Sequence, residues 1–193
     1  MTTNKLFVIY GPSGSGQDSI IEGVAKDIPV ERVITTTTRP MRPDETQKNP
    51  YWFVSKDHFE KAVSNHSFIE WAKTYNGEWY GVSHDEIERI ASSGKIGIWK
   101  VDWQGAKSIR ALFPAVPIIY ITAPIENISK RLRKRDTATE AYFQERMEYI
   151  EDLLNRSDLV YDYKIENNDG GLEQAIGNVE EIIRKHDSES KAG

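Results

Sequence analysis

Residues 11–19 read Gly-Pro-Ser-Gly-Ser-Gly-Gln-Asp-Ser, a glycine-rich stretch of the kind that surrounds a phosphate group. The phosphate-binding loop (P-loop) has the pattern G-x-x-x-x-G-K-[ST]. Its backbone N–H groups cradle the phosphates, its lysine reaches the terminal phosphates and its hydroxyl holds Mg²⁺. Gly11 and Gly16 have this spacing, but Gln17 stands at the lysine position and Asp18 at the hydroxyl position. The spacing therefore predicts a phosphate site with its two most reactive positions altered.

The residues on either side of this loop have the patterns of a strand and a helix. The apolar run at 6–10 predicts a buried strand, and apolar residues recur at helical spacing from Ile20 to Val24. Later apolar runs also have the character of buried strands: 96–101, 117–122 and 161–165. Helical patterns separate these runs, which favours a parallel sheet built from βαβ units. We therefore expect an α/β fold with a P-loop NTPase-type three-layer core.

Several signals mark the ends of helices. The capping box Ser83-x-x-Glu86 opens a helix that ends near Gly94, and Thr137-x-x-Glu140 opens another. The apolar spacing predicts an amphipathic helix over 172–183, and the polar tail at 187–193 is expected to be frayed.

Composition limits the classes of protein that this chain can be. It has 193 residues, a net charge of −5 and 38% hydrophobic residues, as expected for one globular domain. The negative charge argues against a general nucleic-acid binder. The chain has no cysteine, which excludes disulfides and thiolate metal sites, and no apolar stretch reaches the ~20 residues of a membrane span. Without a signal-peptide pattern, we expect a cytoplasmic protein with no membrane partner; the oligomeric state stays open.

The segment at 35–82 holds a run of threonines, three prolines within 40–50 and the run Tyr-Trp-Phe-Val at 51–54. This composition predicts an inserted lobe of small strands. Together with later motifs, the segment resembles the guanylate kinase family in order and spacing over roughly residues 5–185. The motifs are Thr35-Thr-Thr-Thr-Arg39-Pro-Met-Arg42-Pro-Asp-Glu45, Tyr51-Trp-Phe-Val54, Phe68-Ile-Glu70-Trp-Ala72, Trp79-Tyr80-Gly81, Val101-Asp102-Trp-Gln-Gly-Ala106, Arg131-Leu-Arg-Lys-Arg135, Arg146 and Asn167-Asn-Asp169.

The resemblance implies a single domain, 1–193, that transfers phosphate from ATP, with Mg²⁺, to GMP or dGMP. It implies three parts: a core (4–34, 95–125 and 149–186), a nucleoside-monophosphate lobe (35–94) and a helical lid (126–148). It also implies that the GMP phosphate is held by Arg39, Arg42, Tyr51 and Tyr80, which match the family. Guanidinium groups pair bidentately with phosphate oxygens, and phenol hydroxyls donate further hydrogen bonds.

For the guanine base, the resemblance implies contacts from Thr35, Glu70 and Asp102, which match the family. Val82 departs from it, because the family has a hydroxyl there that bonds guanine O6. An unpaired carbonyl costs roughly 1–3 kcal/mol unless Ser83 or water replaces that hydroxyl, so we expect weakened GMP affinity.

On the ATP side, the resemblance implies a phosphate site made of the loop residues and one later asparagine: Gly11, Ser13, Gly14, Ser15, Gly16, Gln17, Asp18, Ser19 and Asn168. It also implies lid arginines that close over the transferring phosphoryl group: Arg131, Arg135 and Arg146. These arginines, with Arg39 and Lys100, are the expected catalytic residues.

Lys100 replaces an aspartate that in the family lies beside the loop and helps to hold the metal. Formal charge over positions 17, 18 and 100 sums to zero in the family pattern and in this chain. One hypothesis is that Lys100 substitutes for the loop lysine while Asp18 becomes a metal ligand. The simpler alternative is that Lys100 and Asp18 form a salt bridge that fills the metal site and ends catalysis.

Three functions therefore remain open. The first is a guanylate kinase-type enzyme with a relocated lysine. The second is a pseudokinase that binds GMP or a phosphorylated partner without phosphoryl transfer. The third is a kinase for another phosphorylated sugar or nucleotide, because the Gly-Ser-Gly-x-Asp-Ser loop also resembles that of ribose bisphosphate kinases. The rest of the chain follows guanylate kinase.

Overall fold

The structure is a computed structural model that describes residues 5–43, 45–74, 77–135 and 139–192, without the side chains of 135 and 190–192. Its main sheet has the strand order β10-β9-β1-β8-β2, and the neighbouring strands in it are parallel. The strands are β1 (Leu6–Tyr10), β2 (Val30–Arg32), β8 (Ile96–Lys100), β9 (Ile118–Thr122) and β10 (Tyr163–Glu166). This confirms the predicted α/β fold with a parallel sheet.

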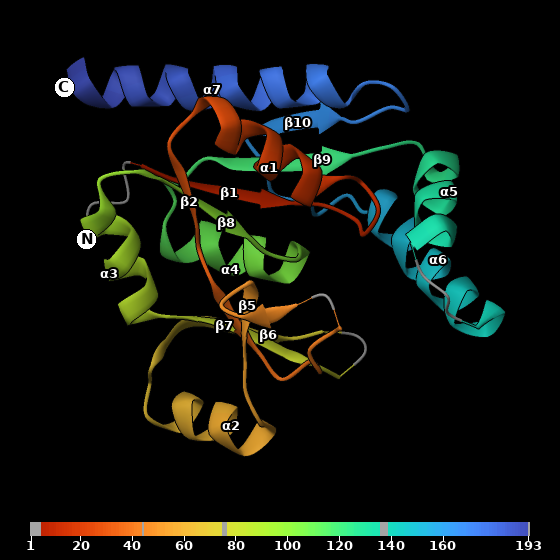
Figure 1. The fold of residues 1–193 in the computed structure, drawn as a ribbon, viewed down its shortest axis with the longest axis horizontal. Coiled ribbons are helices and arrows are strands. Elements are labelled where there is room, and N and C mark those ends of the chain that lie inside the picture. The colour runs from red at the N-terminus through yellow and green to blue at the C-terminus, as the bar shows by residue number, and fades with distance from the viewer. Residues whose placement is uncertain (1–4, 44, 75–76, 136–138, 193) are drawn as a thin grey trace.

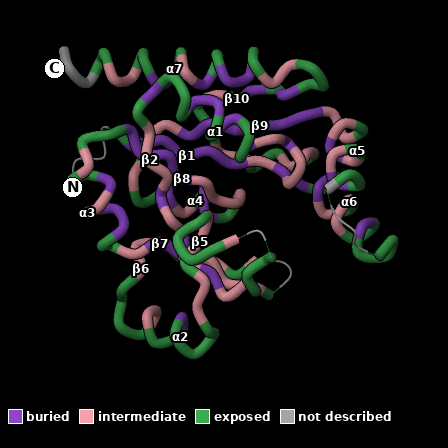
Figure 2. Tube along the Cα trace, viewed as in Figure 1, coloured by how far each residue is buried: buried purple, intermediate pink, exposed green. Residues whose placement is uncertain are grey.

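Helices cover both faces of this sheet, which gives three layers (Figure 1). The helices are α1 (Gln17–Asp27) and α7 (Leu172–Ala192) on one face, and α3 (His84–Ser93) and α4 (Trp103–Leu112) on the other. Alternate residues of β1 face opposite ways: Ile9 packs with Val24 and Val179, whereas Val8 packs with Ile90 and Ile109. Figure 2 shows that the buried residues concentrate in this sheet and on the helix faces toward it.

A second sheet of small strands lies below the first, within the range expected for the inserted lobe (Figure 1). Its order is β4-β5-β3-β7-β6. The elements are β3 (Thr35–Thr37), β4 (Thr46–Gln47), β5 (Pro50–Phe53), α2 (Lys56–Ser64), β6 (Phe68–Lys73) and β7 (Trp79–Ser83). Phe59 of α2 is fully buried against Phe68, with their ring centroids 4.5 Å apart. Helix α3 also falls within 35–94, but Ile87 and Ile90 pack into the core of the main sheet.

The remaining helices, α5 (Ile125–Arg135) and α6 (Glu140–Leu154), project from the end of the main sheet (Figure 1). Thr139 is the N-cap of α6, and its side chain accepts a hydrogen bond from the Tyr142 N–H. The expected cap, Thr137, lies outside the described residues.

The other helix signals can be compared directly with the structure. Ser83 caps α3 as predicted, and Gly94 ends it with a left-handed φ of 71°. The expected fraying after residue 187 was wrong, because α7 continues to Ala192. The Tyr163 hydroxyl lies 2.9 Å from His186 Nε2 and ties α7 to β10 just before this segment. Within the described residues, no helix combines the length and apolarity needed to cross a bilayer.

Candidate functional site

One cavity of about 780 Å³ lies where the carboxyl ends of β1 and β8 face the second sheet. It collects most of the residues that the sequence predicted for both substrates. Those lining it are Gly11, Ser13, Gly14, Gly16, Gln17, Asp18, Ser19, Thr35, Arg39, Arg42, Tyr51, Glu70, Tyr80, Val82, Lys100, Asp102, Arg131 and Arg146. Residues expected at the two ends of a phosphoryl transfer therefore line one cavity.

The loop between β1 and α1 has the close backbone packing that requires glycine. A Cβ atom at Gly11 would lie 1.9 Å from the Ile121 carbonyl oxygen. Gly16 has a φ of 92°, and a Cβ atom there would lie 2.2 Å from Asn167 Nδ2. Ser15 is fully buried beneath the loop and does not line the cavity. The strand, glycine-rich turn and helix thus form as the sequence predicted.

Gln17 bonds to the loop itself. Its side-chain Nε2 donates to the carbonyl oxygens of Gly11 at 2.7 Å and Pro12 at 3.3 Å. The side chain is buried, and its Oε1 accepts no hydrogen bond within the described part of the chain. Gln17 therefore braces the loop backbone but brings no positive charge to it.

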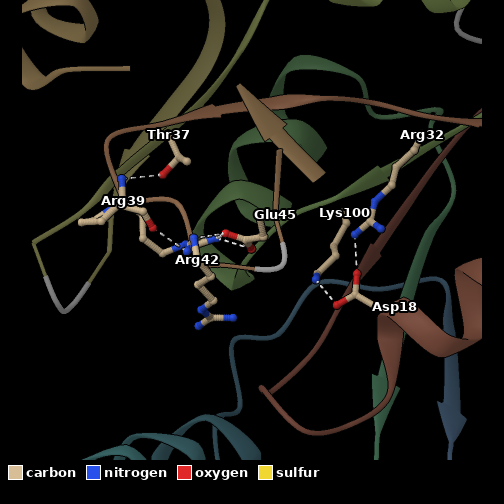
Figure 3. A network of polar contacts seen from close by, with 8 residues as sticks. Asp18, Arg32, Thr37, Arg39, Arg42, Glu45 and Lys100 are labelled. Carbon is tan, nitrogen blue, oxygen red and sulfur yellow. Dashed lines mark hydrogen bonds and ion pairs between the residues drawn. The ribbon is translucent and has the colours of Figure 1, made fainter. Parts of the chain in front are cut away.

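Positive charge reaches the loop from the neighbouring strands. Lys100 of β8 donates from Nζ to Asp18 Oδ2 at 2.6 Å, and Arg32 of β2 pairs with Asp18 Oδ1 (Figure 3). Burial opposes ionisation of Asp18, but Lys100 and Arg32 outweigh it and lower its pKa to about 2. The Lys100–Asp18 salt bridge expected under the simpler alternative is thus present.

Arg32 is the functional candidate that sequence analysis missed. The zero charge summed over positions 17, 18 and 100 omitted it; adding its cation gives a local charge of +1. Its sequence context, a short run at 30–32, carries no phosphate-binding signal. Only the adjacency of β2 and β8 brings it to the loop.

On the opposite side of the cavity, Arg39 is held by other groups of the protein. Its Nη2 donates to both carboxylate oxygens of Glu45, at 2.6 and 2.9 Å, and its Nη1 donates to the Pro40 carbonyl at 2.7 Å. The Arg42 N–H also donates to Glu45, at 2.8 Å, while the Arg42 side chain is exposed (Figure 3). Glu45 therefore orients the Arg39 guanidinium and fixes the backbone at Arg42, a role that sequence analysis did not assign to it.

Two tyrosines complete this group. The Tyr51 and Tyr80 rings lie 5.8 Å apart, and the Arg39 guanidinium lies 5.4 Å from the Tyr51 ring centre. Burial raises the pKa of both phenols, so they remain protonated donors at neutral pH. The arrangement offers guanidinium and hydroxyl donors to one anion, as expected for a phosphate.

The residues expected to bind the base include two neighbouring carboxylates. A Cβ atom at Gly105 would lie 3.2 Å from Glu70 Oε1 and 3.3 Å from Asp102 Oδ1, so both carboxylates approach the same glycine. Asp102 is fixed as the N-cap of α4, since its Oδ1 accepts from the Gly105 N–H at 2.7 Å. Burial, with a smaller contribution from Asp102, raises the pKa of Glu70 to about 7. The pair offers hydrogen-bond acceptors to a ligand with several N–H groups.

Thr35 and Val82 also line this side, and both are buried. Ser83, the possible substitute for the missing hydroxyl at Val82, points the other way, because adjacent residues of a strand face opposite sides. Its hydroxyl accepts from the Glu86 N–H at 3.2 Å as the cap of α3. Ser83 therefore does not replace the hydroxyl, which is a correction to that alternative.

The lid helices already contact the loop. Arg146 donates to Ser13 Oγ at 2.6 Å, and Arg131 donates to the carbonyls of Asn167 at 2.9 Å and Gly14 at 3.4 Å. The side chain of Arg135, the last residue of α5, lies outside the description.

Asn168 is exposed and does not line the cavity, so the structure does not place it with the other predicted donor-site residues. Its neighbour Asn167 is 3% exposed and donates to the Ser15 carbonyl at 2.8 Å. The sequence gives no signal that favours one of the two adjacent asparagines. In the structure, the chain at the end of β10 turns Asn167 inward.

Oxygen ligands that suit Mg²⁺ are present on the loop. The Asp18 carboxylate and the Ser19 residue both line the cavity. Mg²⁺ in phosphate-transfer sites usually takes only one or two carboxylates and draws its other ligands from phosphates and water. The described residues contain no cluster of three or more His, Cys, Asp or Glu that could hold a metal.

Comparisons with known proteins agree with this geometry. The family model described as guanylate kinase matches residues 3–186. The chain is 35% identical to a guanylate kinase of Methylococcus capsulatus, over 95% of this chain and 89% of that protein. It is 37% identical to a guanylate kinase of Buchnera aphidicola, over 95% and 88%. A crystal structure of guanylate kinase from Anaplasma phagocytophilum superposes with a TM-score of 0.66 at 25% identity, over 93% of this chain and 84% of that one.

Proposed function

The chain belongs to the guanylate kinase family, and on that premise we propose that it transfers the γ-phosphate of ATP to GMP or dGMP. The observation that carries this proposal is the single cavity lined by Arg39, Tyr51 and Glu70 on one side and by the glycine-rich loop on the other. Phosphoryl transfer needs its two substrates in line within one water-excluding space.

In this proposal the acceptor phosphate lies among Arg39, Arg42, Tyr51 and Tyr80. The base lies against Thr35, Glu70, Val82 and Asp102. Arg39 and the tyrosines neutralise the acceptor phosphate so that one of its oxygens can approach the ATP γ-phosphate. The carboxylates of Glu70 and Asp102 accept from the N–H groups of guanine, which adenine cannot supply in the same pattern.

On the donor side, N–H groups of the loop residues that line the cavity, 13–14 and 16–19, hold the ATP phosphates, and Lys100 supplies the charge that the loop lacks. Arg131, Arg135 and Arg146 stabilise the charge that develops on the transferring group. Asp18 and Ser19 would hold Mg²⁺, which when bound neutralises phosphate charge. Lys100 supports this assignment by reaching Asp18, one position beyond the usual loop lysine.

A second candidate is binding of GMP without transfer. The observation that favours it is the carboxylate of Asp18, which already has both oxygens engaged by Lys100 and Arg32. If this arrangement persists with ATP present, the metal ligand is blocked. A pseudokinase of this kind keeps the acceptor side and loses only the donor chemistry.

The two candidates separate in one experiment. Purified protein is incubated with ATP and Mg²⁺, with and without GMP, and ADP is measured. The enzyme produces ADP only when GMP is present. The binder produces none, yet GMP still raises its melting temperature, since ligand at 100 times Kd adds about 2.7 kcal/mol of stability. Absence of both turnover and GMP-dependent stabilisation contradicts both candidates.

A further inference from the structure

Three charged side chains from three different elements meet beside the loop. Asp18 comes from the first turn of α1, Arg32 from the end of β2 and Lys100 from the end of β8. Each oxygen of the Asp18 carboxylate is bonded to a different cation (Figure 3). The carboxylate thus bridges two positive groups, as an oxyanion ligand would.

The side chains of the two cations are less exposed than that of their anion. The Arg32 and Lys100 side chains are 26% and 23% exposed, whereas the Asp18 side chain is 51% exposed. Both cations extend from neighbouring parallel strands, which fixes their backbone positions. Asp18 is therefore the member that can turn toward solvent while the cations stay in place.

We propose that Arg32 and Lys100 together form an oxyanion site for the polyphosphate chain of the donor nucleotide, in which the Asp18 carboxylate occupies the position of a phosphoryl oxygen until the ligand displaces it. The proposal rests on the proposed function for the identity of the donor and adds Arg32 to its binding residues. When Asp18 turns away, the ligand faces two cations in place of a net charge of +1, together with the loop N–H groups. The site should therefore bind a polyphosphate even without a divalent cation, and the displaced Asp18 carboxylate is then available to the Mg²⁺ of the proposed function.

Inorganic tripolyphosphate in the presence of EDTA tests this directly, because it has no base, sugar or metal. Its binding is measured by isothermal titration calorimetry. Asp18→Asn removes the carboxylate that competes for Arg32 and Lys100. We expect it to tighten tripolyphosphate binding about tenfold, because a neutral amide competes less well than a carboxylate for hydrogen bonds from charged donors. Arg32→Met and Lys100→Met should each weaken binding about tenfold, whereas Arg32→Lys should retain most of it.

Glu22 provides a matched control. It lies one turn after Asp18 on the same face of α1 and lines the same cavity, but among the described residues no ion pair joins it to either cation. Glu22→Gln removes an equal charge, and a long-range field effect alone would make it tighten binding as much as Asp18→Asn does. We expect Glu22→Gln to change the affinity for tripolyphosphate by less than about twofold.

Two results overturn the proposal: Asp18→Asn binding tripolyphosphate no more tightly than Glu22→Gln, or Arg32→Met binding it as well as the wild type. Thermal unfolding of each variant confirms that it is folded. If Arg32→Met does not fold, the tripolyphosphate affinity of Arg32→Lys is measured in its place. The proposed function fails separately, if wild-type protein binds tripolyphosphate but shows no GMP-dependent ADP formation.

Discussion

The two sides of the cavity differ in which elements supply their charges. On the acceptor side, Arg39 and Glu45 belong to one motif and bond to each other within the second sheet's own loop. On the donor side, the loop keeps its backbone geometry, but its charged groups come from elsewhere: Lys100 from β8 and Arg32 from β2. In the proposed function, the glycines fix where phosphate can approach, and Lys100 and Arg32 on the adjacent strands supply the charge. Backbone shape and charge are therefore separable parts of a phosphate site.

The largest expected effect tests whether Lys100 replaces the missing loop lysine in catalysis. Lys100→Ala should lower kcat for GMP-dependent ADP formation by about 10²–10³, the usual cost of losing one preorganised group at a developing charge. GMP-dependent thermal stabilisation should not change, because Lys100 lies on the donor side. Steady-state kinetics at saturating GMP measures the first effect and a melting curve the second. Activity retained in this variant would show that the donor charge comes from another group.

A substitution at Val82 tests how the acceptor side binds the base of GMP. Val82→Thr keeps the side-chain shape in a position that is 1% exposed and adds the hydroxyl that the family has there. We expect GMP to bind about tenfold more tightly, because an unpaired carbonyl costs roughly 1–3 kcal/mol. Calorimetric titration with GMP measures this. Equal GMP affinity in Val82→Thr and wild type would mean that the base does not present its carbonyl to this position.

The acceptor side should also respond to pH where the donor side does not. Glu70 has its pKa raised to about 7, so its carboxylate, which accepts from guanine, becomes protonated as pH falls. GMP affinity should be about tenfold lower at pH 6 than at pH 8. The same raised pKa predicts that the free energy of unfolding falls as pH rises from about 4.5 to about 7, because the folded state holds the proton more tightly.

Glu70→Gln is the control for this pH dependence. It removes the titration of Glu70 and leaves the titration of the GMP phosphate itself, so any slope that remains belongs to the ligand. An identical slope in wild type and Glu70→Gln would exclude Glu70 as the titrating group. Asp18 has a pKa of about 2, so the donor side should show no comparable change between pH 6 and 8.

The smallest expected effect tests whether Ser83, unlike its neighbour Val82, contributes to stability and not to GMP binding. Ser83→Ala removes the N-cap of α3 and should lower the free energy of unfolding by about 1 kcal/mol. GMP affinity should stay the same, because the Ser83 hydroxyl faces away from the cavity. Urea unfolding and GMP titration of the same variant test both statements, and weaker GMP binding would restore Ser83 as a base contact.

The sequence predicts local features of this molecule better than those that depend on strand order. Glycine spacing and flanking periodicity are enough to predict the strand, turn and helix around Gly11 and Gly16. The meeting of Arg32 with Asp18 depends on β2 pairing with β8, a contact between residues far apart in the chain that no local pattern encodes. The fraying expected after residue 187 was inferred from polarity, but polar residues such as Glu and Lys are also good helix formers.

The choice between Asn167 and Asn168 illustrates the same limit. Both belong to one motif, and only the direction in which β10 ends decides which one turns inward. Glu86 is similar: the capping-box pattern assigns its carboxylate to the start of α3, but it accepts instead from the Ile34 N–H at 2.7 Å. In each case a tertiary contact competes with the local pattern and prevails.

The contacts of Arg131 and Arg146 with the loop have a consequence for the entropy of the reaction. A free arginine side chain has about 2 kcal/mol of rotamer entropy to lose when it is fixed in place. Here both guanidinium groups are fixed by hydrogen bonds to the protein's own Ser13, Gly14 and Asn167. Much of that disorder is lost when the chain folds, so the arrival of a nucleotide has correspondingly less ordering to impose on the lid.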